Sequence, residues 1–295
     1  MRWTAVLAAA AALAGAAPAQ ERPVRVICFG AHPDDCELKA AGVAALWAAK
    51  GHQVKFVSVT NGDAGHWRQS GPELAKRRKA EVEACAKVLG IETHVLDIPD
   101  GELEPTLAHR KTVTRLIREW DANVVIAPRP NDYHPDHRYT GVLVQDSAFM
   151  VGVPKFLPDV PALKANPVFL FYSDGFKRPT PFRADVVVGI DAAVEKKAAC
   201  IEKLESQFYE GGALGNAGLL PADAAGRAKR REQVRAAYLG RARQVADAHR
   251  EKLAEFYGPA AAKGVVHAEA FEVCEYGRQP SPAELRRLFP FFPGG

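Results

Sequence analysis

The feature of this 295-residue chain that most constrains its fold is the alternation of short apolar runs with helical patterns. The runs VRVICF, VKFVSV and THVLDI are each followed by a stretch with helical spacing, and a fourth run, NVVIAP, follows the third helix. Strands that are apolar on both faces are typical of a parallel sheet covered by helices on both sides. We therefore predict an α/β fold with a mostly parallel sheet.

The second half of the chain is less regular. Residues 150–182 are rich in proline and contain one further apolar run, VFLFYS. The remaining predicted elements are a strand at VVVGID, a helix that begins at Asp191, a long helical stretch over 223–256, a strand at VVHAEAFEVCEYG and a short helix at PAELRRLF. Without internal repeats or a long linker, residues 20–295 are predicted to form a single domain with a helical and irregular C-terminal part.

Two His-Pro-Asp sequences, beginning at His32 and His134, each follow an apolar strand. In a doubly wound sheet of order 3-2-1-4-5, the first and fourth strands are neighbours at the topological switch point, where such folds bind ligands. By our count the two sequences follow these two strands. They are therefore predicted to form two halves of one site.

The residue types in these two sequences suit a metal ion. Imidazole and carboxylate are common zinc ligands, and a catalytic zinc usually has three protein ligands and one open position. A set of His32, Asp35 and His137 would leave Asp34 and His134 free for proton transfer. The simpler alternative is that each His-Pro-Asp only caps a helix, because proline suits the first helical turn.

The sequences FGAHPDDCE and YHPDHRYTG, with TNGDAG between them, resemble the PIG-L (LmbE-like) family of zinc-dependent N-deacetylases. The resemblance extends to about residue 190 and implies a Rossmann-like three-layer sandwich. It also implies the roles of six residues: metal ligands His32, Asp35 and His137, general base Asp34, and His134 with Asp136 beside it to support the transition state.

The resemblance implies a hydrolase that removes an acetyl group from an N-acetylated sugar or sugar conjugate. Protonated His134, held in position by Asp136, would stabilise the oxyanion. Zn²⁺ is the expected cofactor, although the same ligands would accept Fe²⁺ or Co²⁺. Two alternatives stay open: hydrolysis of another amide, such as a thiol conjugate, and a non-catalytic carbohydrate-binding protein.

Several polar residues lie in loops at the predicted ligand edge of the sheet. The candidate substrate contacts are Asn61, Arg68, Asp100 and Arg129. Asn-Gly and Asp-Gly are also ordinary turn signals, so each of them could be a simple loop residue. His267 and Glu269 could close the pocket from the C-terminal part, whereas His66, His94 and His109 are expected at the surface.

The N-terminus predicts export. A single arginine, an Ala-rich apolar run and an Ala-x-Ala site ending at Ala19 are typical of a secretory signal peptide over residues 1–19, so we expect a periplasmic or extracellular protein. The run is too short for a stable membrane anchor. A net charge of +4, with lysines and arginines scattered along the chain, gives no reason to expect nucleic acid. Oligomeric state cannot be inferred.

The five cysteines form no Cys-x-x-Cys pair, which disfavours a thiolate zinc site or a redox dithiol. Cys28 and Cys85 lie in apolar patterns and are predicted to be core residues. Cys36, at the start of a predicted helix, is a weak candidate for a nucleophile because no base accompanies it.

Overall fold

The structure, a computed structural model, describes residues 22–293, so the predicted signal peptide lies outside the described residues. The strands are β1 Arg25–Gly30, β2 Gln53–Ser58, β3 Glu92–Val95, β4 Val124–Ala127, β5 Val168–Tyr172, β6 Val186–Gly189 and β7 Ala268–Gly277. The α-helices are α1 Asp35–Ala49, α2 Gly71–Leu89, α3 Leu107–Glu119, α4 Pro135–Met150, α5 Val194–Ile201, α6 Ala224–Ala248, α7 Arg250–Tyr257, α8 Pro259–Gly264 and α9 Pro282–Leu288. Short helical turns are η1 Asp191–Ala193, η2 Glu205–Tyr209, η3 Gly212–Leu214 and η4 Ala217–Leu219.

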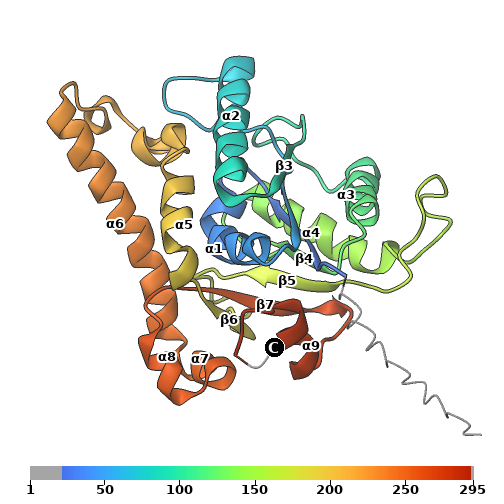
Figure 1. Ribbon diagram of the computed structural model, residues 1–295. Helices are drawn as coiled ribbons and strands as arrows, with labels where there is room; N and C mark the ends of the chain where they lie inside the picture. The colour runs from blue at the N-terminus through green and yellow to red at the C-terminus, as the bar shows by residue number, and fades with distance from the viewer. Residues whose placement is uncertain (1–21, 294–295) are drawn as a thin grey trace, which may run out of the picture.

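The seven strands form one sheet in the order β3-β2-β1-β4-β5-β7-β6. β1 to β5 are parallel, whereas β7 is antiparallel to both β5 and β6. The predicted mostly parallel sheet is therefore confirmed, and so is the order 3-2-1-4-5 of its first five strands. Figure 1 shows these strands at the centre of the molecule with helices around them.

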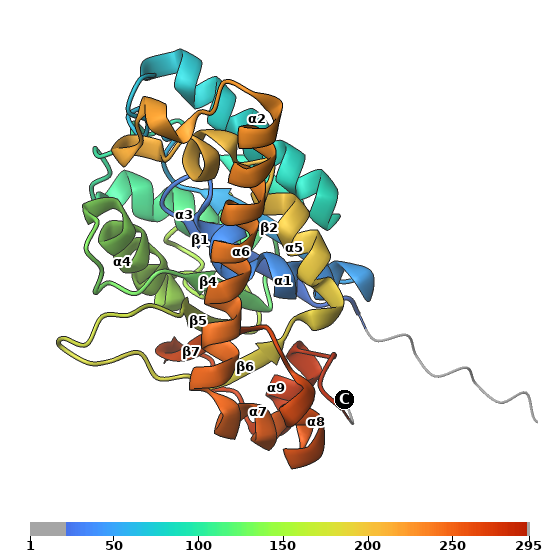
Figure 2. The same cartoon turned by 90° about the vertical axis from the view of Figure 1, so that its left-hand side faces the viewer.

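The sheet is the middle of three layers. Side chains alternate along each strand, so Val26 and Cys28 of β1 pack in one core with α1, α2 and α5, whereas Ile27 and Phe29 pack in the other with α3 and α4. Figure 2 shows α3 and α4 on one side of the sheet and α1 and α5 on the other. The three-layer sandwich and the predicted core positions of Cys28 and Cys85 are confirmed.

Two predicted helices are shorter than their patterns suggest. The helix that begins near Asp191 ends at Ile201, because Leu204 (φ −89°, ψ 57°) leaves the helical region before the π-helical turn η2. The stretch 223–256 is divided into α6 and α7 at His249 (φ −125°, ψ 36°). Among residues 22–293, no helix is long and apolar enough to cross a bilayer.

A buried ion pair joins α1 to the C-terminal part of the chain. Lys197 Nζ lies 2.6 Å from Glu269 Oε1 and also donates to the Leu38 carbonyl (2.7 Å). The Glu269 carboxylate accepts the backbone N–H groups of Gly42 (2.9 Å) and Val43 (2.8 Å) inside α1. The prediction that Glu269 closes the ligand pocket is therefore wrong, since its carboxylate is committed to this helix.

We predict that Lys197→Met lowers the free energy of unfolding by about 3–5 kcal/mol, because it leaves the Glu269 carboxylate buried without a counter-charge. Urea unfolding followed by circular dichroism would measure the change. The double variant Lys197→Met/Glu269→Gln should recover part of the loss, since the amide stays neutral and keeps an acceptor. A single variant as stable as the unmodified chain would contradict the importance of the pair.

Candidate metal centre

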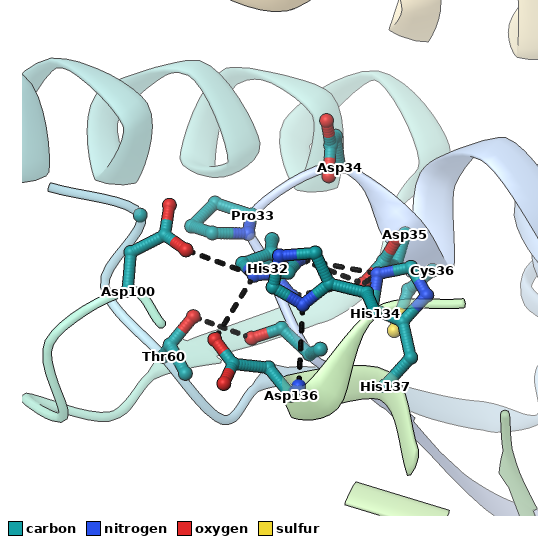
Figure 3. Close-up of polar contacts among 12 residues, drawn as sticks. His32, Pro33, Asp34, Asp35, Cys36, Thr60, Asp100, His134, Asp136 and His137 are labelled. Atoms are coloured by element: carbon teal, nitrogen blue, oxygen red, sulfur yellow. Dashed lines mark hydrogen bonds and ion pairs between the residues drawn. The ribbon is translucent and has the colours of Figure 1, made fainter. Parts of the chain in front are cut away.

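The two His-Pro-Asp sequences meet because β1 and β4 are hydrogen-bonded neighbours in register Cys28↔Ile126. His32 lies just after β1, and His134 caps α4 just after β4. The His32 and His134 rings are 4.6 Å apart between centroids, and those of His32 and His137 are 5.1 Å apart. Figure 3 shows all three imidazoles facing one another. The predicted convergence of the two segments is confirmed.

Three donor atoms of the predicted ligand residues form a compact triangle. His32 Nδ1 lies 3.2 Å from His137 Nε2 and 3.6 Å from Asp35 Oδ2, and the latter two atoms are 3.4 Å apart. Zinc–ligand bonds of about 2.0–2.2 Å in a tetrahedral site require ligand atoms about 3.3–3.6 Å apart. The spacing and the chemistry of these residues therefore fit a divalent metal ion.

The second nitrogen of each imidazole in the triangle contacts a carboxylate. His32 Nε2 lies 3.1 Å from Asp100 Oδ1 and 3.2 Å from Asp136 Oδ2. His137 Nδ1 lies 3.1 Å from Asp132 Oδ1. Such contacts fix the tautomer and raise the basicity of a metal-binding imidazole. Asp132 was not identified from the sequence, although it lies only five positions before His137.

Two other groups of side chains could also hold an ion. The three imidazoles place donor atoms within 4.8 Å of one another, and so do His32, Asp100, His134 and Asp136. Both groups include His134, and their donor atoms are known only to lie within 4.8 Å of one another, whereas the longest edge of the triangle is 3.6 Å. The triangle is therefore the most compact of the three groups that could hold an ion.

Burial and neighbouring charges shift the pKa values of the three residues of the triangle. Burial opposes a charge on His32, but Asp100, Asp136 and Asp35 outweigh it and raise the pKa of this imidazole well above its usual value. The pKa of His137 is raised against the effect of burial, chiefly by Asp35 and Asp132. The pKa of Asp35 is lowered because both imidazoles outweigh its burial. A cation is therefore favoured between these groups, and a metal ion would take the place of the protons.

Asp34 lies apart from the triangle, as Figure 3 shows, and lines the cavity described below. Its Oδ2 is 3.3 Å from Arg78, a buried residue of α2 that also donates to the Pro33 carbonyl (3.2 Å). Burial raises the pKa of Asp34, and the Arg78 guanidinium only partly opposes the shift. Arg78 was missed from the sequence because nothing distinguishes it from the other basic residues of its helix.

The expected relation between Asp136 and His134 is wrong. The Asp136 carboxylate is directed to His32 and to the Gly101 N–H (2.7 Å) rather than to His134. Only the backbone N–H of Asp136 reaches His134, where it donates to Nδ1 (3.2 Å). Burial, followed by the charges of His32 and His137, lowers the pKa of His134. A neutral His134 ring with Nδ1 as acceptor carries its proton on Nε2.

A cavity of about 600 Å³ opens above these residues. Its polar floor includes His32, Asp34 and Asp100. Its mouth includes apolar side chains, among them Tyr133, which is 73% exposed, and Leu214, which is 95% exposed. One wall is formed by residues that lie much later in the sequence than the two His-Pro-Asp sequences. These residues are Gln207, Phe208, Gly211, Gly212, Ala213, Leu214 and Tyr238.

Of the four predicted substrate contacts, only Asp100 lines this cavity. The Asn61 amide donates to Asp97 (3.2 Å), and the Arg68 guanidinium lies over the Trp67 ring at the surface. Arg129 is buried and donates twice to Asp174, at 2.6 Å each. The cavity lining therefore does not include Asn61, Arg68 or Arg129, whose side chains contact other loop residues instead.

Three weaker predictions are corrected. The Cys36 thiol is buried in the core, where burial raises its pKa well above the usual value, so it is no nucleophile. His66 is buried rather than exposed, and its Nε2 lies 3.0 Å from Glu210 Oε2. His267 does not close the pocket, because its Nδ1 lies 2.8 Å from Asp191 at a distant position.

Sequence comparison supplies relatives with known activities. The profile of the PIG-L family, described as GlcNAc-PI de-N-acetylase, matches residues 27–148. Diacetylchitobiose deacetylase of Thermococcus kodakarensis is 31% identical over 197 residues, which cover 63% of this chain and 71% of that protein. The extension of one domain to residue 295 stays a prediction.

Structural comparison finds the same fold in other proteins. The N,N'-diacetylchitobiose deacetylase of Pyrococcus horikoshii, solved with an inhibitor, is 25% identical, with a TM-score of 0.63 over 84% of this chain and 83% of its own. GalB, the 4-carboxy-2-hydroxymuconate hydratase of Pseudomonas putida KT2440, is 20% identical, with a TM-score of 0.68 over 87% and 98% of the two chains. The second likeness shows the fold alone.

We predict that His32→Ala purifies without stoichiometric metal, because it removes one corner of the triangle and the ring on which Asp100 and Asp136 converge. Asp132→Asn should weaken metal binding by about 10–100-fold, since it changes only the contact behind His137. Mass spectrometry of bound metal and competition with a chelator would measure the two effects. Full metal content in His32→Ala would contradict the ligand assignment.

Proposed function

The chain belongs to the PIG-L family of N-deacetylases, and we propose that it is a metal-dependent hydrolase of N-acetylated sugars. The reaction would remove the acetyl group of an N-acetylglucosamine-type sugar and release acetate and a free amine. The observation that carries this proposal is the triangle of His32, Asp35 and His137 at the base of the cavity. Both deacetylase relatives support the choice of substrate class.

We propose zinc as the ion, since two imidazoles and a carboxylate are a common zinc set, although Fe²⁺ or Co²⁺ would also suit these ligands. When bound, it would acidify a water molecule and polarise the amide carbonyl. The triangle leaves one side open to the cavity, so that water and substrate can reach the site. His32 and His137 remain oriented by the carboxylates behind them.

Asp34 is the proposed general base. Its carboxylate lines the cavity beside the triangle but belongs to none of the triangle's contacts, so it is free to accept a proton from the attacking water. Arg78 holds this carboxylate from behind. The proton then passes to the amine nitrogen as the C–N bond breaks.

His134 is the proposed donor to the tetrahedral oxyanion. Because its Nδ1 accepts the Asp136 N–H, Nε2 keeps a proton and can donate even when the ring is neutral. This arrangement replaces the expectation of an imidazolium held by the Asp136 carboxylate. The Asp136 side chain instead orients His32.

The shape of the cavity suits an oligosaccharide. Its floor is polar and charged, whereas Tyr133, Phe176 and Leu214 place apolar surface at the mouth. Aromatic and aliphatic side chains can pack against the C–H face of a sugar ring whose hydroxyl groups bind the polar floor. A second sugar could therefore rest at the mouth while the N-acetyl sugar enters.

Export stays part of the proposal and rests on the N-terminal pattern alone. If it is correct, the protein recovered from a bacterial host should begin near Gln20. The N-terminal sequence of protein from the periplasmic fraction would test it.

We predict release of acetate from N,N'-diacetylchitobiose, with activity lost on treatment with a chelator and restored by added divalent metal. Coupled acetate measurement and mass spectrometry of the amine product would follow the reaction. No release of acetate from any N-acetylated saccharide, by protein with bound metal, would overturn the proposed function. Binding without turnover would favour a carbohydrate-binding protein, and turnover of thiol conjugates alone would favour the other amidase.

We predict that Asp34→Asn retains its metal but loses about 10²–10⁴-fold in kcat, because the amide cannot accept the proton of the attacking water. Steady-state acetate release together with metal analysis would measure both quantities. Asp121→Asn is the matched control: the residue lies at a positive φ (49°) that asparagine tolerates, after α3 and outside the cavity. Near-normal turnover by Asp34→Asn would remove Asp34 from its role.

A further inference from the structure

A positive charge in the wall of the main cavity has no part in the proposed chemistry. Lys39 lies one turn after Asp35 on α1 and lines this cavity, half-buried. Arg78, the other lysine or arginine of the described lining, is already bound by Asp34 and by two backbone carbonyls. Burying an ammonium group costs free energy unless an anion or hydrogen-bond acceptors compensate for it. The position of Lys39 therefore requires an explanation.

The Lys39 ammonium group keeps donors free for a ligand. Of its three N–H groups, one donates to the Ser173 carbonyl (2.8 Å). Within residues 22–293, Lys39 forms no ion pair: Asp174 binds Arg129 through both oxygens (2.6 Å each), and Asp35 faces the histidines of the triangle. Burial lowers the pKa of Lys39, although the charges of Asp35 and Asp174 oppose this shift. An anion from the substrate would supply the missing partner.

A small cavity opens beside Lys39, and we call it the side cavity. Its volume is about 90 Å³, and it shares Leu38, Lys39 and Tyr238 with the main cavity. Its walls come from α1, α5, α6, the first residues of β7 and Ser173 after β5. Figure 1 and Figure 2 both show α6 beside α5. Because the two cavities share part of their lining, a substituent of a sugar in the main cavity can reach the side cavity.

The side cavity contains more cations than anions. Lys39, Lys197 and Arg241 line it, whereas Glu269 is the carboxylate among its described lining residues. Lys197 and Glu269 neutralise each other at 2.6 Å. Arg241 lies on the same face of α6 as Tyr238, three residues before it, and its guanidinium is 4.5 Å from the centre of that ring. In the part of the chain that the structure describes, neither Lys39 nor Arg241 has a carboxylate partner, so the side cavity carries two cations without counter-ions.

From this placement we propose that the side cavity binds a carboxylate of the substrate, with the half-buried Lys39 and the exposed Arg241 as its cations. The inference rests on the proposed function and names its substrate class: an N-acetylated amino sugar that carries an acidic substituent or is linked to a uronate. Lys39 lines both cavities, so the amide can reach the triangle while the carboxylate reaches Lys39. A carboxylate that accepts from an ammonium or guanidinium group makes hydrogen bonds about twice as strong as those between neutral groups.

Other occupants suit the side cavity less well. Pockets that enclose a complete small molecule measure about 300–1,000 Å³, so a volume of about 90 Å³ suits a substituent rather than a second sugar ring. The Glu269 carboxylate lines the same space and opposes a dianionic phosphate more strongly than a monoanionic carboxylate. The simpler alternative is that Lys39 only ties α1 to the end of β5 through the Ser173 carbonyl. That role would not distinguish charged from neutral substrates.

The test uses two pairs of substrates that differ in charge, with metal-loaded full-length protein. N-Acetylmuramic acid carries its carboxylate on the N-acetyl sugar itself, and a hyaluronan tetrasaccharide carries it on the neighbouring glucuronate. In the partner of each pair, the carboxylate is converted to a carboxamide of nearly the same shape and no charge. We expect kcat/KM for acetate release to be about tenfold or more higher for the acid than for its carboxamide in at least one pair.

The variant Lys39→Met should lose this preference, so that the ratio of the two kcat/KM values falls to within about twofold, because the acid alone loses a charged partner. Arg241→Met should lower the ratio by about threefold, since Arg241 is exposed and water screens its charge. The matched control, Lys50→Met, removes a lysine charge at the exposed C-terminal end of the same helix, outside both cavities, and should leave the ratio unchanged.

The other outcomes also decide. Equal losses for acid and carboxamide in Lys39→Met would assign Lys39 to structure and overturn the inference; if this variant fails to fold, an undiminished ratio in Arg241→Met overturns it. Deacetylation of N,N'-diacetylchitobiose without preference for either acid overturns it and leaves the proposed function standing, whereas acetate release from none of these saccharides removes the proposed function itself. A preference for N-acetylglucosamine 6-phosphate over N-acetylglucosamine that depends on Lys39, without preference for either acid, would assign the side cavity to phosphate and overturn it as well.

Discussion

The parallel pairing of β1 with β4 is the interaction on which the candidate centre depends. The ladder fixes the carboxyl ends of two segments about a hundred positions apart side by side. Pro135 then starts α4, whereas Pro33 lies two residues before the start of α1. Backbone hydrogen bonds between buried apolar strands thus set the distance between His32 and His137. To share an ion, the two imidazole rings then need only the right orientation. The carboxylates of Asp100, Asp132 and Asp136 hold the rings in that orientation.

The two nitrogens of each imidazole have different partners, and these partners decide the role of each histidine in the site. His32 directs Nδ1 to the triangle and Nε2 to carboxylates, whereas His137 does the reverse. His134 turns Nδ1 to a backbone N–H instead, which keeps it outside the triangle and leaves a donor available. Three histidines of similar sequence context therefore acquire different chemistry from the partner of one ring nitrogen. Burial contributes too, since it strengthens each of these contacts.

The sequence was sufficient for the parts of the molecule that follow from local pattern and chain topology. Apolar strands and helical spacing predicted the parallel sheet and its first five strands in order, and the position of His32 and His134 after neighbouring strands predicted their convergence. Side-chain direction was not predictable: Asp136 could face either histidine, and Arg129 turned out to pair with Asp174. The sequence did not predict that Arg78 and the 207–214 wall line the cavity, because long-range packing, not local pattern, brings them there.

The placement of β7 between β5 and β6 has a consequence for biosynthesis. Within residues 22–293, β6 pairs only with β7, which comes about eighty residues later, and β5 also pairs with β7 on its outer edge. Until those residues leave the ribosome, the nascent chain presents an unpaired, fully apolar β5 edge, the kind of surface that recruits other strands. The last strand to join the sheet is therefore β7, near the C-terminus. Pairing between strands so far apart in the sequence is slow, and it leaves the partly folded chain exposed to aggregation.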